Sequence, residues 1–132
     1  MESALRTALI AWLRSDTALS GTINSIEEEA PVTSTPPSVA IVASASADWS
    51  SKTSTGREAR IAFELTDRRD TPEHTAALAR RIEQRIATLD PDQPGFRVVA
   101  TQFVRSRVER RPRSLRAVLL EYRFKLLETP TE

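Results

Sequence analysis

The sequence contains no cysteine, one histidine and three glycines. The absence of cysteine excludes disulfides, thiolate catalysis and zinc sites with a thiolate ligand. The single histidine, His74, excludes a histidine-rich metal cluster. Three isolated glycines cannot form the Gly-x-Gly-x-x-Gly or Walker loops that bind phosphates. We therefore expect no cofactor, no metal ion and no enzymatic activity.

Long apolar runs and lysine are also scarce. The longest apolar run, Ala8 to Leu13, has six residues, which is far too short for a signal peptide or a membrane span. We expect a soluble protein of a reducing, cytoplasm-like compartment that does not associate with a membrane. Among the 19 Lys and Arg residues only Lys52 and Lys125 are lysine, and 18 Asp and Glu residues leave a net charge of +1. That balance argues against a general nucleic-acid binder.

The 132 residues, 39% hydrophobic and 28% charged, fit one folded domain that spans residues 1–132. The apolar spacing predicts a short amphipathic helix from Ser3 to Ser15, with Ser3 as N-cap. Residues 20–37 are rich in Pro, Ser and Thr and contain an acidic run, which indicates a variable loop with one short strand near residues 22–26. Residues 128–132 are expected to form a short C-terminal tail.

The rest of the chain predicts strands grouped around one long helix. Thr71 as N-cap and Pro72 in the first turn begin a helix that ends near Leu89. Alternating or apolar segments predict four strands, at residues 39–47, 58–67, 96–107 and 115–127. The expected fold is α+β, with a mainly antiparallel sheet of about four strands, two helices packed on one face, and the order α-β-β-α-β-β.

An arginine-rich segment lies between the last two strands, and we interpret residues 106–114 as its loop. Its arginines are Arg105, Arg107, Arg110, Arg111, Arg113 and Arg116. One interpretation is a hairpin tip that contacts nucleic-acid phosphates. The other is an ion-pair patch between subunits, because arginine tolerates partial burial and binds carboxylates through two hydrogen bonds. No aromatic residue is interleaved in the segment, which weakens single-strand recognition.

Three further features have two interpretations each. Trp49, in a loop rich in serine and threonine, either folds back onto the core or serves as an interface anchor. His74, near the start of the second helix, has neither a second histidine nor a cysteine as a catalytic partner, so we expect a partly solvated side chain. The acidic run Glu27 to Glu29 is either a solvated loop or a negative surface for a lumen or a neighbour.

The motif Asp48-Trp49-Ser50-Ser51-Lys52-Thr53, followed by Gly56-Arg57-Glu58 and an alternating strand, resembles a small family of phage and prophage tail-completion proteins. The similarity extends over residues 3–128. It includes the leading helix, the strand entry Pro37-Ser38-Val39, the helix from Glu73 to Leu89 and the closing pair of strands. The acidic run at 27–29 departs from the basic and aromatic stretch that the family often has before the proline.

This resemblance implies a tail terminator like those of long-tailed phages and gene transfer agents, a virion protein that is assembled in the bacterial cytoplasm. Such subunits form a ring, usually a hexamer, at the head-proximal end of the tail, where the ring stops tube growth and joins the tail to the head. The expected partners are other copies, the major tail tube protein and the head–tail connector or adaptor, with DNA passing through the lumen without sequence-specific binding. The candidate interface residues are Trp49, Lys52, Arg57, Arg107, Arg110, Arg111 and Arg113. The alternative function is a small nucleic-acid-binding module that uses the hairpin at 105–116.

Overall fold

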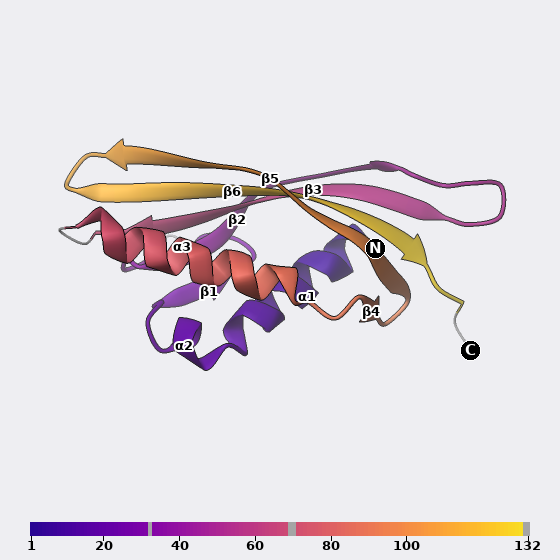
Figure 1. Cartoon of the computed structure of the whole chain (residues 1–132), viewed down its shortest axis with the longest axis horizontal. Coiled ribbons are helices and arrows are strands. Elements are labelled where there is room, and N and C mark those ends of the chain that lie inside the picture. Colours follow the sequence, from indigo (N-terminus) through magenta and orange to yellow (C-terminus); the bar gives the residue numbers. More distant parts are fainter. Residues whose placement is uncertain (32, 69–70, 131–132) are drawn as a thin grey trace.

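A computed structural model describes residues 1–31, 33–68 and 71–130. Its strands form one curled sheet, and its helices lie on one side of that sheet (Figure 1). In chain order the elements are α1 (Glu2–Arg14), α2 (Thr17–Ser20), β1 (Ser25–Glu27), β2 (Ser38–Asp48), β3 (Gly56–Asp67), α3 (Pro72–Ala87), β4 (Asp92–Gln93), β5 (Phe96–Arg111) and β6 (Leu115–Glu128).

The strand order in the sheet is β1-β2-β3-β6-β5-β4. The short strand β1 pairs with β2 in parallel, and every other pair is antiparallel. Gly56 lies opposite Leu127 and Asp67 lies opposite Arg116. The loop between β2 and β3 and the turn between β5 and β6 therefore project from opposite ends of the sheet (Figure 1).

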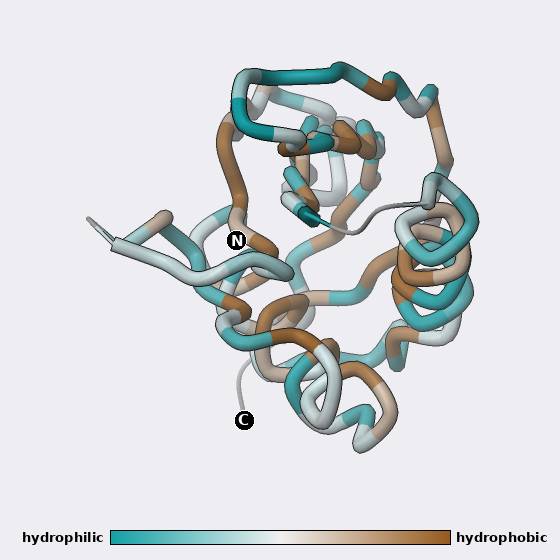
Figure 2. Tube along the Cα trace, turned by 90° about the vertical axis from the view of Figure 1, so that its left-hand side faces the viewer, coloured by the Kyte–Doolittle hydropathy of each residue, from teal (hydrophilic) through white to brown (hydrophobic). Residues whose placement is uncertain are grey.

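The core lies between the central strands and the helices. Alternate residues of β3 and β6 point toward the helices, and Phe63, Leu120 and Phe124 are among the fully buried side chains. In Figure 2, which looks from the end with the β5–β6 turn, α3 presents its hydrophobic residues to the sheet and its hydrophilic residues to solvent. None of the helices described is long and apolar enough to cross a membrane.

The predicted fold class is wrong in its strand number, helix number and order. Six strands form a mixed sheet, and three helices precede or interrupt it in the order α-α-β-β-β-α-β-β-β. The elements left out of the predicted order are short: α2 has four residues, β1 three and β4 two. Of these, the sequence predicts only a short strand near residues 22–26, which overlaps β1. Segments of two to four residues are too short to show a helical or strand periodicity. Their conformation is fixed instead by a cap or by a neighbouring strand.

The predicted element boundaries also change. The expected loop at 20–37 contains the end of α2 and all of β1, with residue 32 outside the described residues. The first helix starts at Glu2 with Met1 as N-cap, so Ser3 is not the cap. Strand β6 ends at Glu128, and residues 131–132 of the expected tail lie outside the described residues.

A bulge reverses the predicted faces of β2. Ile41 pairs with Phe63 but Ala43 pairs with Ala62, so Val42 is an extra residue on β2. Beyond the bulge, Ser44 and Ser46 share the helix-covered face with Val39 and Ile41. The alternation in the sequence assigns Ala43 and Ala45 to that face, and this prediction is wrong because the inserted residue shifts the period by one.

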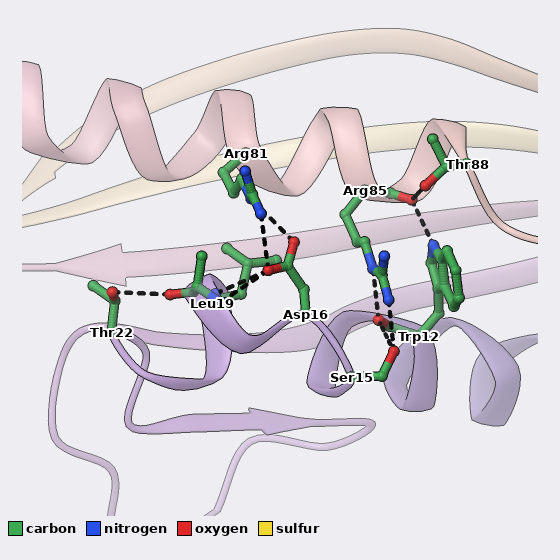
Figure 3. Close-up of polar contacts among 9 residues, drawn as sticks. Trp12, Ser15, Asp16, Leu19, Thr22, Arg81, Arg85 and Thr88 are labelled. Atoms are coloured by element: carbon green, nitrogen blue, oxygen red, sulfur yellow. Dashed lines mark hydrogen bonds and ion pairs between the residues drawn. The ribbon is translucent and has the colours of Figure 1, made fainter.

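Polar contacts connect α1 and α2 to α3 (Figure 3). The guanidinium of Arg81 donates to both carboxylate oxygens of Asp16, at 3.0 and 3.1 Å. The Arg85 guanidinium lies 3.4 Å from the ring centre of Trp12 and donates to the Trp12 carbonyl, while the Trp12 indole N–H donates to the Arg85 carbonyl at 2.7 Å. The sequence pattern places both arginines on the solvent side of α3, where they instead join two helices.

Asp16 has two structural roles at this junction. Its carboxylate is buried and also accepts hydrogen bonds from the backbone N–H groups of Ala18 and Leu19, so it caps α2. The hydrogen bond from Arg81 is the main cause that lowers the pKa of Asp16, and the two backbone donors add to it against the opposing effect of burial. The charged form of Asp16 therefore stabilises the packing of α2 on α3.

Candidate interaction surfaces

The loop that contains Trp49 is held by backbone and serine hydrogen bonds. Trp49 N–H donates to the Gly56 carbonyl at 2.9 Å, and the Ser50 hydroxyl accepts from Gly56 N–H at 3.0 Å. The same hydroxyl donates to Asp48 at 2.6 Å. A Cβ atom at position 56 would lie 2.5 Å from the Trp49 carbonyl oxygen, which explains why a glycine follows this loop.

Trp49 itself lies outside the hydrophobic core. Its side chain is 38% exposed, and the Lys125 ammonium of β6 lies 5.2 Å from the ring centre. This distance fits a cation–π contact. The ring is therefore positioned at the end of the sheet and remains accessible to another molecule. Lys52 and Arg57 are exposed at the same end, and the Arg57 guanidinium donates to the Ser46 hydroxyl at 3.4 Å.

The arginine-rich segment is mostly strand. Strand β5 continues to Arg111, so the turn comprises only residues 112–114 and the predicted loop at 106–114 is wrong. Alternation then separates the arginines: Arg110 pairs with Arg116 on the helix-covered face, whereas Arg107 and Arg111 lie on the opposite face. A continuous strand forms here because the β6 partner strand extends equally far.

Several of these arginines are bound to carboxylates of the same chain. The Arg111 guanidinium donates to both Glu64 oxygens, at 2.9 and 3.1 Å, and this contact raises the pKa of Arg111 above its ordinary value. Arg105 makes the same two-bond contact with Glu121 at 3.0 Å. Arg107 contacts Glu109 at 2.8 Å. These pairs reduce the positive charge that the face opposite the helices presents to phosphate.

The tip of the β5–β6 hairpin carries Arg113. Arg113 and Ser114 have φ angles of 64° and 61°, in the left-handed region that residues with a side chain seldom adopt. The Arg113 carbonyl accepts a hydrogen bond from the Arg68 guanidinium at 3.1 Å, which ties the tip to the end of β3. Arg113 itself is exposed.

His74 has a structural contact with Asp67 at the junction of β3 and α3. Its Nδ1 lies 3.1 Å from the Asp67 carboxylate, which also accepts from the Thr75 hydroxyl at 2.7 Å. Asp67 is fully buried, while the His74 side chain is about one-third exposed, as the sequence predicts. Burial opposes ionisation of Asp67, but the hydrogen bonds from Thr75 and His74 outweigh it and lower the pKa of Asp67.

The acidic run lies against α1. Arg14 contacts Glu27 at 2.5 Å, and Thr7 donates to Glu28 at 3.3 Å. Glu29 is exposed. Much of this run therefore serves to attach β1 to the first helix. Within residues 1–31, 33–68 and 71–130, no group of three or more His, Asp or Glu side chains is arranged to hold a metal ion.

Sequence reasoning missed an apolar surface on the outer strands. The exposed large hydrophobic residues other than Trp49 are Val42, Val99, Phe103, Val104 and Val108. Val42 belongs to β2 and the others to β5. The sequence shows these residues only as apolar strand positions, which normally indicate a core. Exposure could not be inferred without knowing that β5 lies next to the edge of the sheet.

An apolar groove runs between α3 and the outer half of the sheet. It has a volume of about 520 Å³ and is lined by Ala76 and Ala79 of α3 and by Val108, Val118 and Leu120 of β5 and β6. Arg80, Glu83 and Arg110 contribute charged side chains to its walls. The groove exists because α3 covers β6 but leaves the helix side of β5 partly open.

The candidate residues form two separate groups. Trp49, Lys52 and Arg57 lie at the end of the sheet that carries the β2–β3 loop (Figure 1). Residues 107–113 extend to the opposite end, where the β5–β6 turn lies. The two groups therefore cannot contact one ligand within a single copy of the chain. They can act together only if one copy meets the next end to end or edge to edge.

Comparison with known proteins gives a family and a fold. The family model described as "Tail completion protein gp17" matches residues 7–126. A chain in the solved structure "Virion of native gene transfer agent (GTA) particle" is similar in fold, with a TM-score of 0.80, 23% sequence identity and 96% of each chain covered. No curated protein matches the chain at comparable stringency.

Proposed function

The chain belongs to the tail completion protein gp17 family, and we propose that it acts as a tail terminator. It is a structural component of the virion with a role in phage tail assembly. The proposal adds that copies of the chain form a ring, hexameric as the resemblance implies, at the head-proximal end of the tail. There the ring stops tube growth. The family match over residues 7–126 is the observation that carries this function.

The distribution of the candidate residues supports a ring subunit. A ring of subunits that share one orientation has two different rims, each formed by the same end of every subunit. This chain presents the Trp49 loop at one end of its sheet and the Arg113 turn at the other. We propose that one rim of the ring meets the major tail tube protein and the other meets the head–tail connector.

The ion pairs on β5 favour this function over nucleic-acid binding. Arg105 and Arg111 each bind a carboxylate of the same chain through two hydrogen bonds. Binding a phosphate would require these pairs to be broken, and the net charge of +1 offers little further attraction. DNA is expected to pass through the lumen without sequence-specific contact.

Deletion of the gene tests the function. Electron microscopy of the lysate should show heads without tails and free tails that are longer than normal, and a plasmid copy of the wild-type gene should restore joined particles. Tails of normal length attached to heads in the deletion strain would contradict the proposal. A gel-shift titration of the purified protein with duplex DNA tests the alternative, and we expect no binding at 0.15 M salt.

A further inference from the structure

Within the residues that the structure describes, strands β2 and β5 each leave most of one edge without a backbone partner. Strand β1 pairs with β2 only at Ser38 to Ala40, so residues 41–48 of β2 have a free edge. Within the described residues, strand β4 pairs with β5 only at Phe96 and Arg97, and Val98 N–H donates to the Pro91 carbonyl at 2.7 Å, so residues 99–111 have a free edge as well. A free edge exposes unpaired N–H and C=O groups, which can pair with another strand.

The two edges suit each other in direction and length. Within one copy β2 and β5 run in opposite directions, since three antiparallel steps separate them through β3 and β6. If a second copy continues the sheet in the same orientation, its β2 meets β5 as an antiparallel strand. β4 then blocks only the first residues of β5, and β1 blocks only the first residues of the incoming β2. The eight free residues 41–48 can therefore face residues 99–107.

The side chains are also complementary in size. Residues 43–47 of β2 read Ala-Ser-Ala-Ser-Ala. They include no proline and none of the charged side chains that commonly protect an edge strand. The facing part of β5 carries the exposed side chains of Val99, Phe103 and Val104. Small side chains on one strand leave space for large ones on the other. All five exposed large hydrophobic residues outside the Trp49 loop lie on these two strands.

We propose that adjacent copies of this chain join through antiparallel pairing of β2, residues 41–48, with β5, residues 99–107, so that the sheet continues from one subunit to the next. The occupant of each free edge is a second copy of the chain. This inference rests on the proposed ring and specifies the strands that close it. The contact is heterologous, because a β2 edge meets a β5 edge, and it can therefore repeat around a ring.

Engineered cysteines test this contact, because the natural chain has none. Ala45 and Gln102 are exposed and lie in one row across the sheet, through the pairs Ala45–Arg60, Arg60–Arg123 and Gln102–Arg123. Two strands separate them within one copy, a spacing of about 14 Å that no disulfide can bridge. A disulfide in the double variant A45C/Q102C must therefore join two copies.

The experiment uses particles assembled in the deletion strain complemented with each variant. Three double variants combine Q102C with A43C, A45C or A47C, which samples the stagger between the strands. After mild oxidation, a non-reducing immunoblot should show a ladder that rises one subunit at a time for at least one variant, at least tenfold above control. The matched control is A62C/Q102C, because Ala62 lies on the central strand β3, one strand away from the free edge.

The possible outcomes distinguish the edge pairing from the tail terminator function. A ladder from a β2 variant and none from the control supports edge pairing. Particles with normal tails but no ladder from any of the three variants would overturn edge pairing and leave the tail terminator function intact. If a double variant fails to assemble, co-expressed single variants A45C and Q102C should give covalent dimers only when both are present, and their absence overturns the contact. Normal tails in the deletion strain would instead refute the function itself.

Discussion

Strands β3 and β6 at the centre of the sheet have backbone partners on both sides, whereas β2 and β5 have them on one side for most of their length. The central strands pair with each other without a bulge and bury most of one face. The outer strands contain bulges, at Val42 in β2 and at Val99 and Val104 in β5, and expose apolar side chains. The central pair is thus satisfied within one chain, and the outer strands are free to serve contacts between chains.

Matched phenylalanine truncations test this difference most strongly. Phe63 on β3 is fully buried and Phe103 on β5 is 46% exposed, yet both rings pack edge-on against Tyr122. Phe63→Ala should lower the free energy of unfolding by about 3–5 kcal/mol, because it leaves a cavity. Phe103→Ala should lower it by about 1 kcal/mol, the value of an aromatic pair. Urea denaturation measures both, and equal losses would remove the distinction between central and outer strands.

The boundary between the two regions is tested at Gly56, where the Trp49 loop enters β3. Gly56→Ala places a methyl group 2.5 Å from the Trp49 carbonyl oxygen, so the loop must shift. We expect a loss of about 1–3 kcal/mol in unfolding free energy, as for other overpacked sites. Ser54→Ala in the same loop is the control and should change stability by less than about 0.5 kcal/mol. A neutral Gly56→Ala would show that the loop is not fixed to the sheet.

The packing of the helices on the central strands is tested by the pH dependence of the unfolding free energy. Asp16 has a lowered pKa in the folded chain, so the unfolded chain binds more protons and Asp16 contributes stability above about pH 4 that is lost as the pH falls. Asp16→Asn should cost about 1–2 kcal/mol at pH 7 and weaken the pH dependence between pH 5 and 3. The dependence should not vanish, because Asp67 also has a lowered pKa. Glu29→Gln, at an exposed position, is the control and should change the unfolding free energy at pH 7 by less than about 0.5 kcal/mol.

The smallest effect on stability is expected at Trp49. Trp49→Ala removes a contact with Lys125 and should lower the unfolding free energy by about 0.5–1 kcal/mol. If Trp49 is an interface anchor, the same variant should reduce the yield of joined particles at least tenfold, since aromatic anchors dominate interface energies. Thermal unfolding and particle counts by microscopy give the two values. Full particle yield would assign Trp49 to the loop structure alone.

The central parts of the fold were predictable because their signals are local. The clean alternation from Glu58 to Asp67 places Phe63 in the core, and Pro72 at the start of a periodic segment predicts α3 within two residues. The faces of the outer strands β2 and β5 could not be predicted, for a physical reason. One extra residue at Val42 reverses the faces of β2, and the sequence contains no signal that distinguishes a bulge from regular alternation.

The candidate surfaces were predictable only in part. The sequence identifies Trp49 as unusual in its loop, and the loop geometry explains the glycine that follows it. The arginine segment suggested a projecting tip, but the pairing of Arg111 with Glu64 depends on two strands that are distant in sequence. The free edges of β2 and β5 are likewise a property of topology, since they exist only because β1 and β4 are short.

Amide hydrogen exchange, compared between the free protein and the assembled particle, tests the central claim most directly. The account predicts that β3 and β6 exchange slowly in both states, because their amides are paired within the chain. Within residues 41–48 and 99–107, the amides that point away from β3 and β6 should exchange rapidly in the free protein and become protected in the particle. Rapid exchange of these edge amides in both states would contradict the claim that β2 and β5 are completed by neighbouring subunits.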